Sequence, residues 1–284
     1  MTKKILVLLF SLLALFVCYQ VEHSVYRNQI KTYGDYVEKV KKQETETWKV
    51  SSNNKTAFVS ENKKEIAAKD DSEPDVKKIA YLTFDDGPSD VTKSIMETLD
   101  TYEVKATFFL IASEITEERE EIVKTLIEKG HTVGIHTYSH RRKEIYASSD
   151  SCIEDFEKAY EKIYRLTEIK PTIYRFPYGS QNRSLRGIGK DVMNAMKEMG
   201  LTYYDWNVDS RDFEGKPSEY SILKNISNFH NYNEPVIIMH DSKSNKITAK
   251  VLPQVIEKIK AAGYEFGTLE NRTEPCQCPH DWEK

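Results

Sequence analysis

The feature that most constrains the fold is the alternation of short β-like runs and helical patterns from residue 79 onward. The strand candidates are IAYLTF, ATFFLI, TVGIH, TIYRF, TYYDWNV, PVIIMH and YEFGTL. Helical periodicity fills the intervals, at residues 90–102, 116–129, 150–167, 187–199, 218–231 and 249–262. Because parallel strands need crossover connections, this order predicts an α/β fold with seven parallel strands, as a doubly wound sheet or an incomplete barrel.

The start of the chain has a different character. An apolar run from Ile5 to Val21 follows Lys3 and Lys4, which predicts a membrane segment at residues 1–21. No small-residue cleavage site follows the run, so we expect an uncleaved anchor, with a cleaved signal peptide as the alternative. The two lysines would stay inside, and the rest of the chain would be exported.

The segments that flank the α/β region carry few structural signals. Residues 22–76 combine a short amphipathic helical pattern with a charged stretch that is typical of a linker. In the tail, residues 271–284, Cys276, Cys278 and His280 lack the fourth ligand and the spacing of a zinc site, which predicts a disordered tail. A strained disulfide and a metal site are the alternatives for this tail.

Composition and charge exclude little. The formal net charge is −4, with acids and bases spread evenly along the chain, so there is no electrostatic argument for nucleic-acid binding. The four cysteines are too unevenly placed to predict a disulfide framework. The sequence does not specify an oligomeric state.

Five groups of polar residues follow the ends of predicted strands. They are Asp85 and Asp86, His136 and His140 (HTYSH), Arg175 (RFPYG), Asp209 and Asp212 (DSRDF), and His240 and Asp241. In parallel α/β folds the carboxyl ends of the strands form the face where ligands bind. Five such groups at one edge therefore predict a single functional site.

The two histidines suggest a catalytic metal. His136 and His140, four residues apart, can combine with one carboxylate in a facial triad that leaves positions open for water and substrate. Taken alone, HxxxH also fits a hydrogen-bonded pair, and Asp-Asp-Gly also fits a surface turn. In the paired aspartates, one carboxylate would bind the cation and its neighbour would take a proton from the attacking water.

Two further groups could complete an acid–base site. Arg175 could orient the base aspartate through a charge-assisted hydrogen bond, with a salt bridge at the rim as the plainer alternative. His240 is the candidate to protonate a leaving group, held in its charged form by Asp212 or Asp209.

These residues resemble a known family. TFDDGP at 83–88, HTYSH at 136–140, RFPYG at 175–179, DSRDF at 209–213 and VIIMHD at 236–241 resemble the five ordered motifs of the NodB-type polysaccharide deacetylases, carbohydrate esterase family 4. The resemblance covers residues 77–270. It implies a distorted (β/α)7 barrel and metal-dependent removal of N-acetyl groups from aminosugar polymers.

The resemblance also implies a role for each motif residue. The general base would be Asp85 and the general acid His240, with Arg175 positioning the base and Asp212 tuning the acid. The ligands of a divalent ion, usually zinc with Co²⁺, Ni²⁺ and Mn²⁺ as alternatives, would be Asp86, His136 and His140.

The same resemblance implies the walls of the acetyl pocket. The backbone N–H of Tyr178 would stabilise the oxyanion, and Phe213 and Ile238 would line the pocket for the acetyl methyl group. Many members carry Trp where this chain has Phe213, so we expect a different pocket shape with the same chemistry. Trp206 is expected in the core or at the rim rather than as a substitute for that Trp.

The resemblance favours peptidoglycan as the substrate, because an exported, membrane-tethered domain of this kind resembles bacterial cell-wall enzymes. It would act at the outer face of the cell membrane and in the cell wall, or be secreted after cleavage. Chitin-like oligomers, poly-N-acetylglucosamine and acetylated xylan are alternative substrates. A non-catalytic glycan-binding relative is the rival class, which the complete set of motif residues disfavours.

Overall fold

The computed structural model describes residues 77–280, and residues 1–76 and 281–284 lie outside this range. The predicted membrane segment and the linker therefore fall outside the described residues. Within residues 77–280, no helix is long and apolar enough to cross a membrane.

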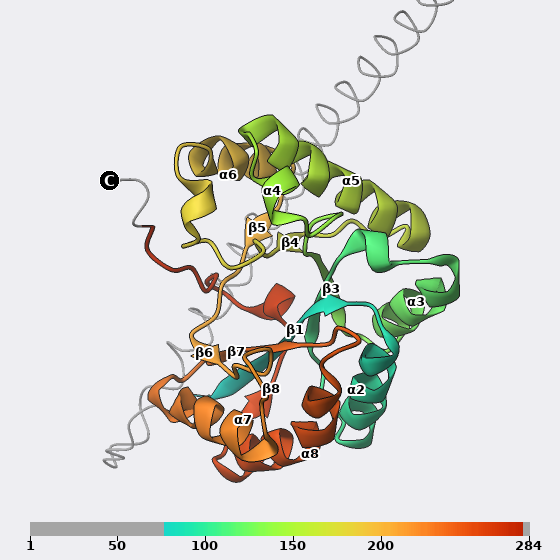
Figure 1. Ribbon diagram of the computed structural model, residues 1–284. Coiled ribbons are helices and arrows are strands. Elements are labelled where there is room, and N and C mark those ends of the chain that lie inside the picture. Colours follow the sequence, from blue (N-terminus) through green and yellow to red (C-terminus); the bar gives the residue numbers. More distant parts are fainter. Residues whose placement is uncertain (1–76, 281–284) are drawn as a thin grey trace, which may run out of the picture. The chain divides into compact units, whose positions relative to one another are not determined.

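The strands form one parallel sheet that curls into an incomplete barrel (Figure 1). Its members are β1 (Ile79–Gly87), β2 (Thr107–Leu110), β3 (Thr132–Ile135), β4 (Ile173–Tyr174), β5 (Thr202–Tyr203), β6 (Val208–Asp209), β7 (Val236–His240) and β8 (Glu265–Phe266). The order is β5-β4-β3-β2-β1-β7-β6, and β8 pairs with the start of β1. The predicted α/β fold is confirmed, and of its two forms the curled, barrel-like one is present.

One predicted strand is wrong in detail. TYYDWNV divides into β5 and β6, so the described sheet has eight strands rather than seven. The amide of Tyr204 still donates to Tyr174, in β4, whereas that of Asn207 donates to Val236, in β7. Between them, the buried Asp205 side chain accepts hydrogen bonds from outside the sheet. At this point the chain therefore passes from β5, at one end of the strand order, to β6, at the other end.

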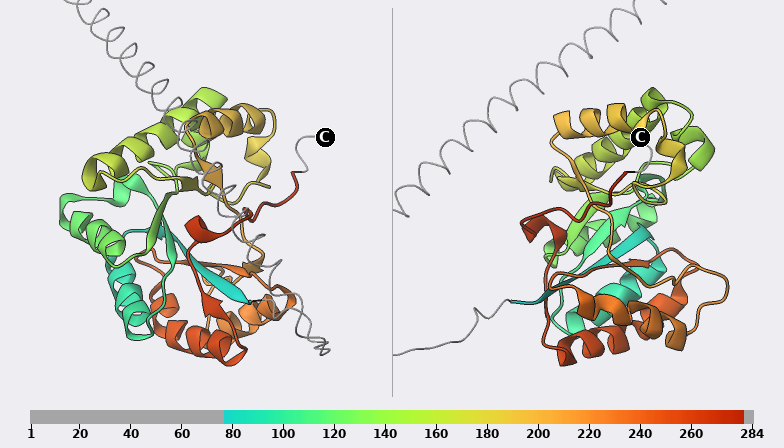
Figure 2. Two further views of the ribbon diagram at one scale, coloured as in Figure 1. Left: turned by 180° about the vertical axis from the view of Figure 1, so that it is seen from behind. Right: turned by 90° about the vertical axis from the view of Figure 1, so that its left-hand side faces the viewer.

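The helices cover the outer face of the sheet (Figure 2). They are α2 (Asp90–Thr101), α3 (Glu120–Glu128), α4 (Arg142–Ile145), α5 (Ser149–Thr167), α6 (Gly189–Glu198), α7 (Glu219–Asn225) and α8 (Lys246–Ala261). Short 3-10 turns occupy Ala112–Glu114, Glu117–Arg119, Arg183–Leu185, Ile226–Asn231 and Leu269–Asn271. Every helix predicted within residues 77–280 is present, although two of them include a 3-10 turn, and the short α4 was not predicted. The short helical pattern within residues 22–76 lies outside the described residues.

The tail departs from the prediction. Residues 275–280, which we call the C-terminal segment, lie beside residues 203–206, where β5 and β6 do not pair. The amide of Asp205 donates to the carbonyl of Cys276 at 2.7 Å, and the side chain of Gln277 donates to the carbonyl of Tyr203 at 3.2 Å. The prediction of a disordered tail is wrong for these residues, because backbone groups left unpaired by the sheet find partners in them.

Strand alternation decides what the barrel interior contains. Along β1, Leu82 and Phe84 pack in the main core, whereas Tyr81 belongs to a second cluster that also contains Phe109. With a period of two, Thr83 and Asp85 share the face of Tyr81. The interior of the barrel thus becomes polar towards the carboxyl end of β1.

A glycine in β3 makes room beneath the site. A Cβ atom on Gly134 would lie 2.7 Å from the ring of Phe109, which is closer than such atoms can approach. The same ring lies 4.3 Å from the guanidinium carbon of Arg175. Gly134 therefore lets Phe109 lie against the buried arginine.

We predict that Gly134→Ala lowers the free energy of unfolding by about 1–3 kcal/mol, because the added methyl group overpacks the interior. Denaturant unfolding measures the loss. Phe109→Leu should offset part of it in the double variant, since the smaller side chain yields space. Strictly additive losses in the two single variants and the double variant would contradict this packing account.

Candidate active site

The predicted polar groups meet at the carboxyl ends of the strands. Asp85 is paired in register with His240, the last residue of β7. His136 follows β3 and is tied to β2 by its amide, which donates to the carbonyl of Leu110. Asp85, His240 and His136 therefore lie together at the carboxyl ends of the strands, where ligands were expected to bind.

Three of these side chains could hold a metal ion. The Oδ1 atom of Asp86 lies 3.5 Å from the Nε2 atoms of both His136 and His140. One ligand atom from each residue falls within 4.8 Å of the other two. The set of two imidazoles and one carboxylate is typical of a catalytic divalent cation.

The protonation states suit a metal as well. The Nδ1 atom of His136 lies 2.9 Å from the carbonyl of Arg175, to which it donates, so its Nε2 lone pair faces the cluster. Burial, together with the nearby His136, lowers the pKa of His140 to about 4. His140 is therefore available as a neutral ligand at pH 7, and the hydrogen bond of His136 directs its Nε2 atom to the cluster.

Two further observations support the fit. The buried Oδ1 atom of Asp86 has no hydrogen-bond partner within the described residues, which is costly unless a cation takes that place. Positive φ angles occur at Asp86 (78°), near the end of β1, and at His140 (54°) and Tyr178 (69°), in loops at the site. Such backbone conformations cost free energy in residues other than glycine and cluster at functional sites. A divalent cation fits this group of residues.

Asp85 lies beside the cluster but is engaged elsewhere. Its Oδ1 atom accepts a hydrogen bond of 2.9 Å from Arg175, and both side chains are almost fully buried. Its Oδ2 atom lies 3.9 Å from the Nε2 atom of His136, whereas the Oδ1 atom of Asp86 lies 3.5 Å from the same nitrogen. The two adjacent aspartates therefore occupy different environments, one at the cluster and one on the arginine.

The guanidinium of Arg175 is fully enclosed and well supplied with acceptors. Besides Asp85, it donates to the hydroxyl of Thr83 at 2.7 Å and to the carbonyls of Tyr204 at 2.9 Å and Asp205 at 3.0 Å. A buried charge needs such partners. The plainer alternative, a salt bridge at the rim, is thus excluded.

Of the two candidate partners for His240, the structure selects Asp212. Its Oδ1 atom lies 2.8 Å from the Nδ1 atom of His240, and its Oδ2 atom accepts from the His240 amide and from the hydroxyl of Thr248. The carboxylate of Asp209 instead accepts from the amide of Arg211. Burial opposes the charged imidazole, but the hydrogen bond and charge of Asp212 outweigh it and raise the pKa of His240 to about 9.

The three residues expected to contact the substrate, Tyr178 through its backbone N–H and Phe213 and Ile238 as pocket walls, lie around these groups. The rings of Tyr178 and Phe213 are half-exposed, and their centroids lie 5.5 Å from the ring of His140 and 4.9 Å from that of His240. Ile238 is buried two residues before His240, on the same face of β7. Trp206 packs instead against Arg175, at 5.6 Å, as expected for a core or rim residue.

The sequence reasoning gave no role to Asp241. Its buried carboxyl group accepts from the hydroxyl of Thr92, and burial raises its pKa to about 8. A Cβ atom on Gly87 would overlap it. Asp241 therefore ties the end of β7 to the turn after Asp86 and to the start of α2. The position of Asp241 directly after His240, in the sequence MHD, was the signal from which a role for it could have been predicted.

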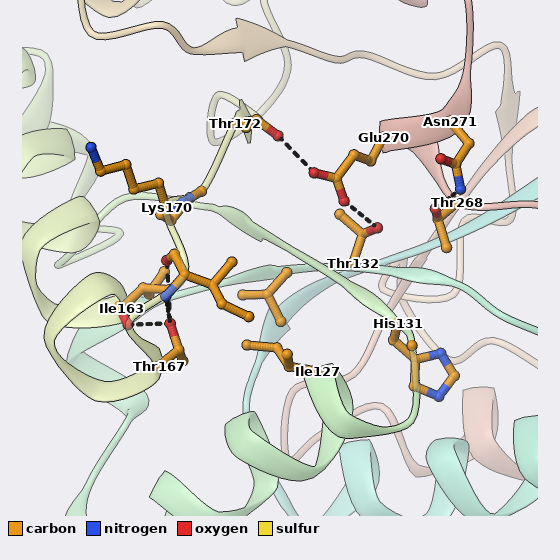
Figure 3. A pocket seen from close by; sticks show the side chains of 14 residues that line it. Ile127, His131, Thr132, Ile163, Thr167, Lys170, Thr172, Thr268, Glu270 and Asn271 are labelled. Atoms are coloured by element: carbon orange, nitrogen blue, oxygen red, sulfur yellow. Dashed lines mark hydrogen bonds between the residues drawn. The ribbon is translucent and has the colours of Figure 1, made fainter. Parts of the chain in front are cut away.

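A separate cavity of about 270 Å³ lies at the opposite ends of β3 and β4 (Figure 3). Glu270 spans it and accepts hydrogen bonds of 3.4 Å from Thr132 and Thr172. Its floor is apolar and includes Ile127 and Ile163. None of the predicted site residues lines this cavity, so it is distinct from the cluster at the carboxyl ends of the strands.

Comparison with known proteins agrees with this geometry. A family model described as polysaccharide deacetylase matches residues 72–204. The chain is 34% identical over 203 residues to the putative polysaccharide deacetylase YheN of Bacillus subtilis, covering 70% of this chain and 69% of that protein. It is 31% identical over 195 residues to a peptidoglycan-N-acetylglucosamine deacetylase of Bacillus cereus, covering 67% and 68%.

A solved structure is similar as well. The catalytic domain of a peptidoglycan N-acetylglucosamine deacetylase from Eubacterium rectale superposes with a TM-score of 0.67 at 34% sequence identity. The match covers 75% of this chain and 98% of that domain.

We predict that Asp212→Asn lowers the pKa of His240 from its value of about 9, because the variant removes the charge that offsets burial. Imidazole signals of the metal-free protein in an NMR titration measure the shift. Thr248→Val, which leaves the Asp212 charge in place, should cause a smaller shift. If Asp212→Asn left the titration midpoint unchanged, Asp212 would not be the group that holds His240 protonated.

Proposed function

Because the chain belongs to the polysaccharide deacetylase family, we propose that it hydrolyses the acetamide groups of N-acetylglucosamine units in peptidoglycan. The observation that carries this proposal is the presence, at one end of one sheet, of a triad that could hold a metal ion, a separate carboxylate on Arg175 and an imidazole paired with Asp212. Relatives named as peptidoglycan-N-acetylglucosamine deacetylases support the choice of substrate.

We propose zinc as the cation held by Asp86, His136 and His140, with Co²⁺, Ni²⁺ and Mn²⁺ as alternatives. Two imidazoles and one carboxylate are a common ligand set of catalytic zinc, and they leave positions open. When bound, such an ion lowers the pKa of a water molecule and polarises a carbonyl group.

The residues of the chain would move the protons. Asp85, oriented by Arg175, would accept a proton from the attacking water. The backbone N–H of Tyr178 would donate to the oxygen on which negative charge develops. His240, protonated at neutral pH and held by Asp212, would donate a proton from Nε2 to the departing sugar nitrogen. One acetamide and one water molecule are consumed, and the products are one acetate and one free amine.

The walls of the site would select the acyl group. Phe213 and Ile238 would contact the acetyl methyl group, and the half-exposed rings of Tyr178 and Phe213 would flank the bound glycan. Family members that carry Trp in place of Phe213 would present more apolar area. We therefore propose a wider opening in this protein with the same catalytic groups.

The location of the enzyme is also a proposal. An uncleaved segment at residues 1–21 would hold it at the outer face of the bacterial cell membrane, within reach of the cell wall. Cleavage of that segment would release it from the cell.

The substrate proposal is tested by assaying acetate and free amine on peptidoglycan, chitin oligomers, poly-N-acetylglucosamine and acetylated xylan. We expect release from peptidoglycan at the highest kcat/KM. Faster release from another polymer would reassign the substrate within the same chemistry. Bound zinc without release from any of the four would instead favour a glycan-binding protein.

We predict that Asp85→Asn keeps its metal and lowers kcat by about 10²–10⁴-fold, because it removes the general base and leaves the triad intact. His136→Ala should lose both metal and activity. Elemental analysis and an acetate-release assay measure the two effects. Asp209→Asn is the matched control and should retain both, since among residues 77–280 this carboxylate accepts its hydrogen bond from the amide of Arg211. Wild-type turnover in Asp85→Asn would remove the base assignment.

A further inference from the structure

Asp205, between β5 and β6, joins parts of the chain that are distant in sequence. It is buried, with 3% of its surface exposed. Its Oδ1 atom accepts from the amide of Ser180 at 2.9 Å, and its Oδ2 atom accepts from the Ser180 hydroxyl at 2.5 Å and from the amide of Cys278 at 2.9 Å. A single carboxylate thus bonds both the loop after β4 and the C-terminal segment.

The backbone of Asp205 is bonded to the same two regions. Its amide donates to the carbonyl of Cys276 at 2.7 Å, and its carbonyl accepts from Arg175 at 3.0 Å. Both polar groups of the backbone and both oxygens of the side chain therefore have partners. Three of these hydrogen bonds are made with the loop after β4, and two are made with residues beyond the last strand.

Two partners of Asp205, Ser180 and Arg175, lie next to proposed catalytic groups. Ser180 follows Tyr178 by two residues, in a tight turn closed by the amide of Gly179 on the carbonyl of Phe176. Arg175 donates to Asp205 from one guanidinium nitrogen and to the base Asp85 from another. A displacement of Asp205 would therefore move the oxyanion amide and the base together.

The chemistry of the site calls for a carboxylate at this position. Two amides and one hydroxyl donate hydrogen bonds to the side chain of Asp205. An ionised carboxylate only accepts, whereas an asparagine would turn an NH₂ group towards a donor. The isosteric change to Asn would leave buried donors without partners, at a cost in free energy.

We propose that Asp205 is a positioning residue for catalysis, and that the C-terminal segment, through Cys276 and Cys278, holds it in place. The inference rests on the proposed deacetylase function. It assigns to residues outside the five motifs the task of fixing Arg175 and the Tyr178 amide.

Two substitutions test the proposal in the full-length, zinc-loaded protein. Asp205→Asn replaces the acceptor, and Cys278→Pro removes the amide hydrogen that Cys278 donates. Cys278→Ser keeps that amide and is the matched control. We expect Asp205→Asn and Cys278→Pro to lower kcat about 10-fold or more, because small misplacements of reacting groups are costly, while KM and zinc content stay at wild-type values. Cys278→Ser should behave as wild type.

Hydrogen exchange supplies a readout independent of activity. The amides of Gly179 and Ser180 should exchange faster in Asp205→Asn and Cys278→Pro than in wild type and Cys278→Ser. Unchanged exchange and unchanged kcat would overturn the proposal. Loss of zinc from Asp205→Asn together with the loss of activity would overturn it as well, since Asp205 would then stabilise the fold of the whole site rather than position Arg175 and the Tyr178 amide.

The two proposals fail in different ways. If wild-type protein released no acetate from any acetylated glycan, the deacetylase function would fail and a catalytic role for Asp205 with it. If wild type were active and Asp205→Asn equally active, the role of Asp205 alone would fail.

Discussion

The buried ion pair between Arg175 and Asp85 is the interaction on which the arrangement of the site depends. A fully enclosed guanidinium is tolerated only with a complete set of acceptors, and the chain supplies them from four positions: Thr83, Asp85, Tyr204 and Asp205. Two of these acceptors are carbonyls at the place where the chain passes from β5 to β6. Because β5 and β6 do not pair there, these carbonyls are free to accept hydrogen bonds from Arg175. The C-terminal segment holds the same stretch of backbone through the hydrogen bond from the Asp205 amide to Cys276.

The same pair explains how two adjacent aspartates can differ in role. The last residues of β1 carry an irregularity in register between Asp85 and Gly87, and Asp86 adopts a positive φ. The carboxylate of Asp85 therefore points into the barrel towards Arg175, while that of Asp86 faces the two histidines. Backbone strain at Asp86 is the cost of separating two negative charges that are neighbours in sequence.

Much of this arrangement could be predicted from the sequence, and the failures share a cause. Periodicity located the main strands, and polar residues at their ends located the site, because both signals are local. TYYDWNV was predicted as one strand because it is rich in β-branched and aromatic residues, whereas its division depends on Asp205 bonding to Ser180 and Cys278. The choice between Asp209 and Asp212 likewise required the register of β6 and β7.

The central claim is that a divalent cation is bound by Asp86, His136 and His140 while Asp85 remains on Arg175. Anomalous diffraction from crystals of the zinc-loaded protein tests it most directly. We expect one strong peak within about 2.0–2.2 Å of one atom from each of the three ligands, with the Asp85–Arg175 hydrogen bond retained. A peak coordinated by Asp85, or the absence of zinc from these three side chains, would contradict the account.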